Sequence, residues 1–262
     1  MHAILDVIGK RKLRHELNTG IIADADNSQT QKLNISGQLG AGSRFFDLRP
    51  VVGNGGQYLA GHYNLPSSVP QGINGEYLTD IMDEINGFTA TNGELIILHI
   101  SHAYNTDEGC RDTNNDEFNK VFDIMQGLTH RCGGLDGDLT DKTINDVIGD
   151  GNACVLIASG GGTARPAEGI YNTGSSFGWD SEGHWSNTDS ISDMASDQLS
   201  YLASHRNIIQ DDGKRLDKFM DMQWILTLEG LENFPGTGLD DHSISIESFA
   251  TRMPYDALFW KA

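Results

Sequence analysis

The chain has 262 residues, 38% of them hydrophobic and 21% charged, which excludes a disordered or fibrous protein and suits one large domain. A formal net charge of -19 repels the phosphates of nucleic acids and of anionic lipids. We therefore expect no nucleic-acid partner and at most peripheral contact with a membrane.

Short apolar runs bounded by glycine, asparagine or aspartate alternate with segments whose apolar residues recur every three or four positions. In chain order, the sequence predicts a helix over 30–42, a strand over 44–48, a weaker strand over 57–62, a helix over 76–88, a strand over 94–101, a helix over 115–128, a strand over 153–159, a helix over 190–203 and a strand over 222–228. This alternation favours parallel βαβ units, with catalytic groups at the carboxyl ends of the strands. The glycine-rich residues 160–192 are expected to form one long loop, either a functional lid or a surface excursion.

No linker interrupts the chain, so residues 1–262 are expected to form a single domain. No apolar run approaches the length of a membrane span, and the first residues lack the long apolar stretch of a signal peptide. We expect a cytoplasmic protein, or a secreted one if a signal precedes this chain. The three cysteines leave two states open: one disulfide with a free thiol, or full reduction.

Asp47 and Arg49 stand at the carboxyl end of the strand predicted over 44–48, and His62 follows thirteen residues after Arg49. Residues two apart on a strand point the same way, so Asp47 is placed to orient the guanidinium of Arg49. A fixed cation with a fork of donors suits a phosphate, and an imidazole suits proton transfer. The three residues therefore fit phosphodiester cleavage. A buried Asp–Arg ion pair with an unrelated histidine is the competing interpretation.

The segment GSRFFDLRP, followed by GHYN, resembles the X-region of the phosphatidylinositol-specific phospholipase C superfamily. The likeness covers most of residues 29–250 and is extended by the segments TQKLNISGQLGAG, ELIILHISHAYN and WSNTDSISDMASDQLSYL. These segments resemble in particular the phospholipase-C-like phosphodiesterases of fungi. The resemblance implies an α/β fold, a distorted TIM barrel. It also implies attack by an inositol 2-hydroxyl on phosphorus, which releases diacylglycerol and a cyclic inositol phosphate.

The resemblance also implies roles for individual residues. His62 matches the second catalytic histidine of the family, the general acid. Arg49 takes a place that calcium-dependent animal members fill with a carboxylate ligand, Asp47 matches a second calcium position, and Ser101 falls where another acidic ligand stands. The pattern is similar to that of bacterial members, in which arginine takes the role of the metal, so no metal and no cofactor are expected.

Both ends of the family pattern are absent from this chain. The first catalytic histidine of the family ends the first strand in a Gly-Ser/Thr-His-Asp/Asn pattern that residues 1–262 lack, and a final strand would follow the segment SIESFATRMPYDALFWKA. We therefore expect a barrel that is incomplete at both ends. The general base would be a histidine upstream of this chain or, as a substitute, His15.

Two further residues are weaker candidates for contact with a substrate. Arg165 lies in the glycine-rich stretch after a strand and is a candidate for the substrate phosphate, although a loop role is the simpler interpretation. Trp224 lies in a predicted strand, where it belongs either to the core or to the mouth of the barrel. A phospholipid or a small phosphodiester is the expected substrate, and the headgroup and oligomeric state stay open.

Two other functions compete with the phosphodiesterase. A non-catalytic member of the same superfamily would keep the barrel as a binding module, which the missing histidine pattern favours. A glycerophosphodiesterase-like enzyme would need clustered carboxylates around a divalent metal, and few are found near Arg49.

Overall fold

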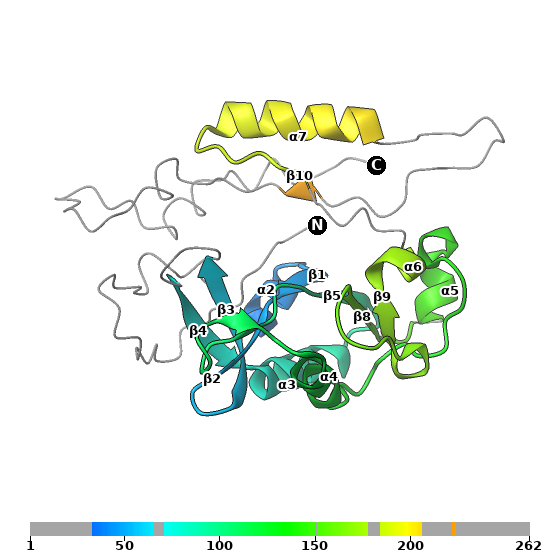
Figure 1. The fold of residues 1–262 in the computed structure, drawn as a ribbon. Helices are drawn as coiled ribbons and strands as arrows, with labels where there is room; N and C mark the ends of the chain where they lie inside the picture. Colours follow the sequence, from blue (N-terminus) through cyan, green and yellow to red (C-terminus); the bar gives the residue numbers. More distant parts are fainter. Residues whose placement is uncertain (1–32, 65–70, 150, 178–183, 206–221, 224–262) are drawn as a thin grey trace.

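The computed structural model describes residues 33–64, 71–149, 151–177, 184–205 and 222–223 (Figure 1). Its centre is a four-stranded sheet in the order β1-β5-β8-β9, all parallel, formed by Phe45–Leu48, Leu95–Ile100, Cys154–Ser159 and Ile170–Asn172. The first three strands are those that the sequence predicts, and their parallel pairing confirms the α/β class. Within the described residues the sheet is open, and its edge strands do not meet to close a barrel.

Alternation along the strands divides their side chains between two apolar cores. Phe46 and Leu48 of β1 belong to the larger core, whereas Phe45 belongs to a smaller core on the other face of the sheet. All six residues of β8 are buried because both faces of this strand are covered. Asp47 shares its face with Phe45, so the sequence places a carboxylate at the end of the side that carries the smaller core.

Three helices cover the face of the larger core: α2 (Ile35–Gly40), α3 (Leu78–Thr89) and α4 (Asn115–Met125) (Figure 1). The buried residues of α3 recur three and four positions apart along one side of the helix, namely Leu78, Ile81, Met82, Ile85 and Thr89. The start of α4 is fixed by a capping box, in which Asn114 and Glu117 each accept a hydrogen bond from the other's backbone N–H at 2.9 Å. These helices confirm the periodicity seen in the sequence.

A second sheet, which the sequence analysis largely missed, has the order β4-β3-β2-β6-β7. Its strands are β2 (Pro50–Gly53), β3 (Gln57–Asn64), β4 (Gln71–Tyr77), β6 (Tyr104–Asn105) and β7 (Arg111–Asp112). Only β3 was predicted, over 57–62. The composition of β4, QGINGEY, is glycine-rich and polar, which argues against a strand. Its Gly72 is required by close packing, because a Cβ there would collide with the carbonyl oxygen of His62.

The expectation of one long loop over 160–192 is wrong. The strand β9 lies inside it and pairs with β8, so three residues of this segment belong to the central sheet. Arg165 and Ile170 exchange backbone hydrogen bonds at 2.9 and 3.1 Å, which close a tight turn around η2 (Pro166–Glu168) just before β9. A strand of three residues is too short for periodicity to reveal it.

The remaining elements are short, except for one helix. They are η1 (Leu139–Asp141), α5 (Ile144–Ile148), α6 (Thr173–Phe177), β10 (His184–Trp185), α7 (Ile191–His205) and β11 (Met222–Gln223). The helix α7 confirms the helix predicted over 190–203, and β11 is the described part of the strand predicted over 222–228. Among the described residues, none of the helices has the length and apolar character that a membrane crossing requires.

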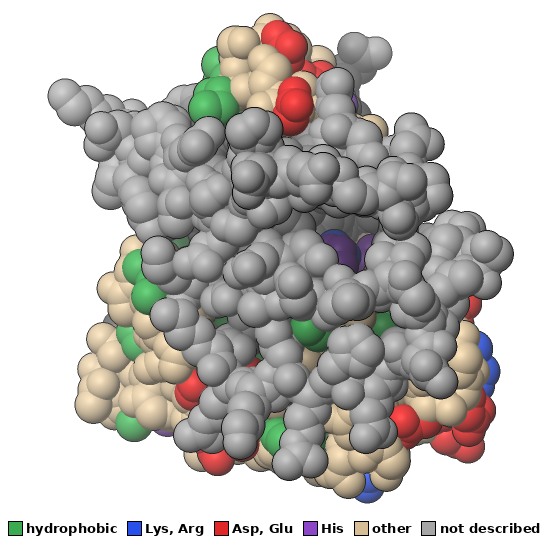
Figure 2. Space-filling view, turned by 90° about the vertical axis from the view of Figure 1, so that its left-hand side faces the viewer, with side chains coloured by type: hydrophobic (Ala, Val, Ile, Leu, Met, Phe, Trp, Pro, Cys, Tyr) green, Lys and Arg blue, Asp and Glu red, His purple; other side chains and the backbone are tan. Residues whose placement is uncertain are grey.

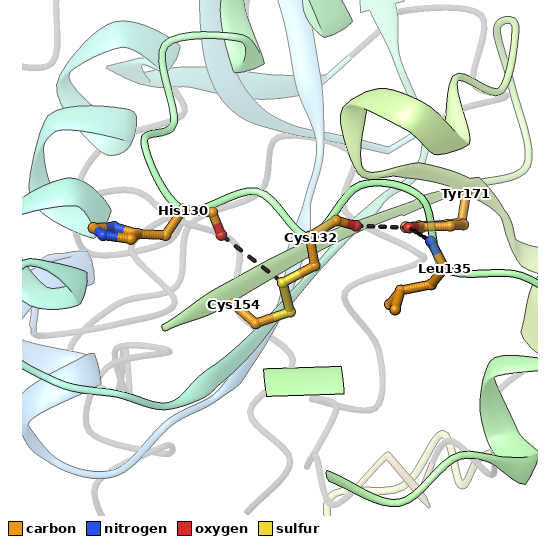
Figure 3. The surroundings of a disulfide bond; sticks show 5 residues. All are labelled: His130, Cys132, Leu135, Cys154 and Tyr171. Carbon is orange, nitrogen blue, oxygen red and sulfur yellow. Dashed lines mark hydrogen bonds between the residues drawn. A yellow bond between two sulfur atoms is a disulfide. The ribbon is translucent and has the colours of Figure 1, made fainter. Parts of the chain in front are cut away.

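A disulfide joins Cys132 to Cys154 at the start of β8, and their Cα atoms are 5.3 Å apart (Figure 3). Close to it, the hydroxyl of Tyr171 donates to the carbonyl oxygen of Cys132 at 2.6 Å and accepts from the backbone N–H of Leu135 at 3.1 Å. The third cysteine, Cys110, is free and buried. Of the two states that the sequence left open, the structure therefore has the disulfide with a free thiol.

Candidate active site

Arg49 lies where the chain leaves the parallel sheet for the second sheet. It follows the last residue of β1 and precedes the first residue of β2. On one side the backbone N–H of Ser101 donates to the carbonyl oxygen of Leu48 at 3.1 Å, and on the other side that of Gly61 donates to the carbonyl oxygen of Arg49 at 2.9 Å. The residue is thus held between the end of β5 and the strand β3, at the edge where parallel sheets carry their functional groups.

Asp47 is the centre of a polar cluster at this edge. Its Oδ2 accepts a hydrogen bond from Nε of Arg49 at 3.0 Å, and its Oδ1 accepts one from the hydroxyl of Ser101 at 2.5 Å. Nδ1 of His99 lies 3.4 Å from the same Oδ1. The Asp47 side chain is 10% exposed, whereas Arg49 and His99 are 24% and 22% exposed. Asp47 and Arg49 are therefore in direct contact, as the predicted orientation of Arg49 by Asp47 requires.

These partners keep Asp47 ionised in spite of its burial. Burial alone would raise the pKa of Asp47, since a charge is disfavoured away from water. The hydrogen bond with His99, the positive charge of Arg49 and the hydrogen bond from Ser101 outweigh burial and hold the pKa well below its usual range. The cluster is consequently an anion between two nitrogen donors and a hydroxyl, and not a neutral acid.

His99 is the member of this cluster that was not predicted from the sequence as a site residue. The parallel register of β1 and β5 sets Asp47 directly opposite His99, and paired residues project from the same face.

Ser101 lies in the cluster as well, two residues after His99. The residue that follows it, His102, is exposed and has a positive φ of 43°, a conformation that few residues other than glycine adopt. The chain therefore turns sharply just after β5, and the hydroxyl of Ser101 is held against Asp47. The expected place of Ser101 in the site rests on this hydrogen bond.

His62 lies on β3, next to the residue that is hydrogen-bonded to Arg49. A Cβ on Gly61 would meet the side chain of Val51, which places Gly61 on one face of the second sheet. By alternation His62 shares the other face with Ala60, a member of the larger core. The backbone of His62 is thus close to that of Arg49, while its half-buried imidazole starts from the opposite side of the strand. Its role as general acid stays a prediction.

Arg165 is placed with helix α4. Its Nη1 lies 2.8 Å from a carboxylate oxygen of Asp123 and 3.7 Å from one of Glu168, and its guanidinium carbon lies 5.8 Å from the ring centre of Phe122. The hydrogen bond to Asp123 raises the pKa of Arg165 above its usual value. The guanidinium therefore has carboxylate partners on the face of the sheet opposite to Asp47. Contact with a substrate phosphate stays a prediction for this residue. His15 and Trp224 lie outside the described residues.

The side chains that β8 contributes beside the cluster are small. The register continues from Asp47 and His99 to Ala158 of β8 and Tyr171 of β9, and the position after Ala158 on that face is Gly160. Among the described residues, the atom that lies within 4 Å of a Cβ built on Gly160 is Oγ1 of Thr173, at 3.5 Å. This row of the face therefore combines small residues on and just after β8 with the large, buried ring of Tyr171 on β9.

The cluster is poorly suited to a divalent cation. Asp47 is its one carboxylate, and both oxygens of Asp47 already face nitrogen or hydroxyl donors. Across the described part of the chain, no group of three or more histidine, cysteine or acidic side chains is arranged to hold a metal ion. Calcium binds to several oxygen ligands at once, so these residues do not fit it.

No protein-family model matches the chain, and no curated protein matches it. Solved structures of the phosphatidylinositol-specific phospholipase C of Staphylococcus aureus are similar to it at 15% sequence identity. Two of them, from work on the modulation of membrane binding by that enzyme, give TM-scores of 0.47 and 0.48 and cover 73% of this chain. A mutant form gives 0.46. The chain spans 65% of the length of these structures.

Proposed function

We propose that the protein cleaves a phosphodiester in the manner of a phosphatidylinositol-specific phospholipase C, without a metal ion. The observation that carries this proposal is the contact between Asp47 and Arg49 at the carboxyl edge of the parallel sheet. A carboxylate that accepts a hydrogen bond from Nε fixes the plane of the guanidinium. The Arg49 side chain is 24% exposed, so the guanidinium is not sealed in the core.

In the proposed reaction a hydroxyl of the substrate attacks phosphorus. A new O–P bond forms while the bond to the leaving oxygen breaks, and the charge that develops on the phosphoryl oxygens is stabilised by the guanidinium of Arg49. The attacking hydroxyl gives its proton to a base, for which His15 is the candidate within this chain. His62 gives a proton to the departing alkoxide. With phosphatidylinositol the products would be diacylglycerol and a cyclic inositol phosphate.

Phosphorus NMR of the protein with phosphatidylinositol in detergent micelles and EDTA tests this proposal. We expect a cyclic phosphodiester signal to appear under chelation. Replacing Arg49 with lysine should lower kcat/KM by at least about a hundredfold, because an ammonium cannot reproduce the planar fork of donors. The matched control is Arg44→Lys: Arg44 precedes β1, and its Nε lies 2.6 Å from a carboxylate oxygen of Glu94. This variant should stay within about threefold of the wild type.

The competing functions give different results in the same experiment. Turnover that requires an added divalent metal would contradict the proposal and favour a glycerophosphodiesterase-like enzyme. Binding of the lipid headgroup without any product would favour a non-catalytic binding protein. That second function is favoured by the sequence, because residues 1–262 lack the Gly-Ser/Thr-His-Asp/Asn pattern of the family.

A further inference from the structure

His99 is the third partner of Asp47 in the polar cluster. Its Nδ1 lies 3.4 Å from the oxygen of Asp47 that Ser101 also contacts, while Arg49 holds the other oxygen. The ring lies near that of Phe45, with ring centres 6.2 Å apart and a tilt of 33°. Because the His99 side chain is 22% exposed, water reaches the imidazole and protons exchange with it.

We propose that His99 is a positioning residue that sets how much of the positive charge of Arg49 is available to a substrate phosphate. This inference rests on the proposed function, since it assigns a further residue to the same site. The two oxygens of Asp47 divide its charge between partners on opposite sides, Arg49 on one and His99 on the other. A stronger attraction between Asp47 and His99 therefore weakens the electrostatic attraction between Asp47 and the guanidinium of Arg49.

The charge of the cluster follows the state of the imidazole. With His99 neutral, the charges of Asp47 and Arg49 cancel. With His99 protonated, the cluster carries one net positive charge, and a phosphodiester anion is attracted more strongly. An imidazole ordinarily changes its charge between about pH 5 and 8. Phosphodiester affinity should therefore be higher in the lower part of that range and should fall as the pH rises through it.

Few other groups of the described residues affect this balance. Just after β5, Ser101 is neutral, and His102 follows it at an exposed position. The neighbouring strand β8 presents Ala158, and beyond it β9 presents Tyr171, whose pKa is raised by burial. On the second sheet the charge of Arg49 reaches Tyr104, whose pKa is nevertheless raised, first by burial and then by Asp112. Both tyrosines are neutral from pH 5 to 8. The other imidazole that the proposed reaction places near the phosphate is that of His62, which starts from the opposite side of β3.

The first test measures binding of dimethyl phosphate, whose single charge does not change between pH 5 and 8. In the wild type we expect the dissociation constant to rise about fivefold across this range. The variant His99→Asn keeps an N–H donor near the place of Nδ1 but cannot titrate, so it should bind with the weaker affinity at every pH. His102→Asn and His130→Asn are the matched controls. His130 contacts the hydroxyls of Thr89 and Thr129 near the start of β8, and both controls should keep the wild-type pH profile.

A second test does not depend on catalysis or on the phosphate. Proton NMR of the histidine Cε1–H signals follows the imidazole of His99, assigned by its loss in His99→Asn. In Asp47→Asn the midpoint of that titration should move to lower pH, because the carboxylate that stabilises the imidazolium is gone. A midpoint that does not move would overturn the coupling between the two residues.

The two tests separate this inference from the proposed function. If dimethyl phosphate binds and its affinity keeps the wild-type pH dependence in His99→Asn, then His99 does not set the charge of the site and the inference is wrong. If the midpoint moves with Asp47→Asn but no phosphodiester is bound or cleaved, the coupling stands while the proposed function fails. A variant His99→Leu, which lacks the donor, should bind about threefold or more weakly than His99→Asn.

Discussion

Asp47 is a nearly buried carboxylate whose charge is kept by three neighbours, and this makes it a source of pH-dependent stability. In the folded protein its pKa is lowered, although burial acts in the other direction. A group with a depressed folded pKa stabilises the protein above its unfolded pKa of about 4 and loses that contribution as the pH falls. The acid limb of the stability curve should therefore contain a component that belongs to Asp47.

We predict that Asp47→Asn removes this component. At pH 6 the variant should lose about 1 to 3 kcal/mol of unfolding free energy, because Arg49 and His99 lose their charged partner. Below pH 5 its stability should fall less steeply than that of the wild type. Urea unfolding between pH 6 and 3 measures both effects, with Asp83→Asn at an exposed position on α3 as the control. Parallel acid limbs in wild type and variant would show that Asp47 is already protonated or unpaired.

The residues of the site were predictable to different degrees. The pairing of Asp47 with Arg49 follows from their spacing on one strand, and the structure confirms the contact. The place of His99 depends on the register between β1 and β5, which are separated in sequence by three strands of the second sheet and α3. Spacing along one strand contains no information about register across strands, so the third partner of Asp47 was missed.

At the scale of elements, the predictions held where a strand is buried on both faces or a helix has a clear apolar side. The strand β8 and the helix α3 are examples. They failed for strands that tertiary contacts impose on an unfavourable composition. The strand β2 begins with a proline and has four residues, and β4 contains two glycines. The register between neighbouring strands, and not side-chain preference, fixes these segments.

The glycine-rich turn after β8 shows such a tertiary constraint, and it gives a second prediction. Gly162 has a φ of +68°, and a Cβ there would lie 2.5 Å from the ring of Phe122 and 2.9 Å from that of Phe118 on α4. Gly134 has a similar φ of +78° but open space around it. Gly162→Ala should therefore cost about 2 to 4 kcal/mol of unfolding free energy, and Gly134→Ala only about 1.

Urea unfolding at neutral pH measures this difference between the two glycines. The comparison isolates packing, since the cost of the left-handed backbone is common to both variants. Equal losses would mean that the turn is not packed against α4. In that case the segment after β8 would be an excursion on the surface, as one interpretation of the sequence had it.

At the scale of the whole molecule, the disulfide ties two distant segments of the chain to each other. It closes a loop between Cys132 and Cys154, which are 22 positions apart, and a cross-link of that span contributes about 3 kcal/mol in the chain-entropy account. The double variant with serine at both positions should lose about that amount in urea unfolding. Alkylation of the denatured, unreduced protein should label one cysteine, Cys110, and labelling of all three would contradict the bridge.

The charge of the whole molecule sets a condition on its proposed substrate. A net charge of -19 opposes approach to an anionic bilayer, and on the face drawn in Figure 2 the described residues display more acidic than basic side chains. The one positive charge that the proposal needs, on Arg49, is partly neutralised by Asp47. Encounter with a membrane is therefore expected to be limited by long-range repulsion, while the chemistry is governed by short-range contacts.

The dependence of turnover on ionic strength distinguishes the long-range repulsion from the short-range contacts. Raising the ionic strength from 0.01 to 0.15 M shortens the Debye length from about 30 to about 8 Å, which screens the repulsion between whole surfaces. Turnover of vesicles that contain phosphatidylinositol should then rise several-fold. Turnover of a monomeric short-chain phosphatidylinositol, which carries one charge, should change by less than about twofold. A rate on vesicles that falls with salt would mean that a local basic surface draws the protein to the lipid, against the sign of its net charge.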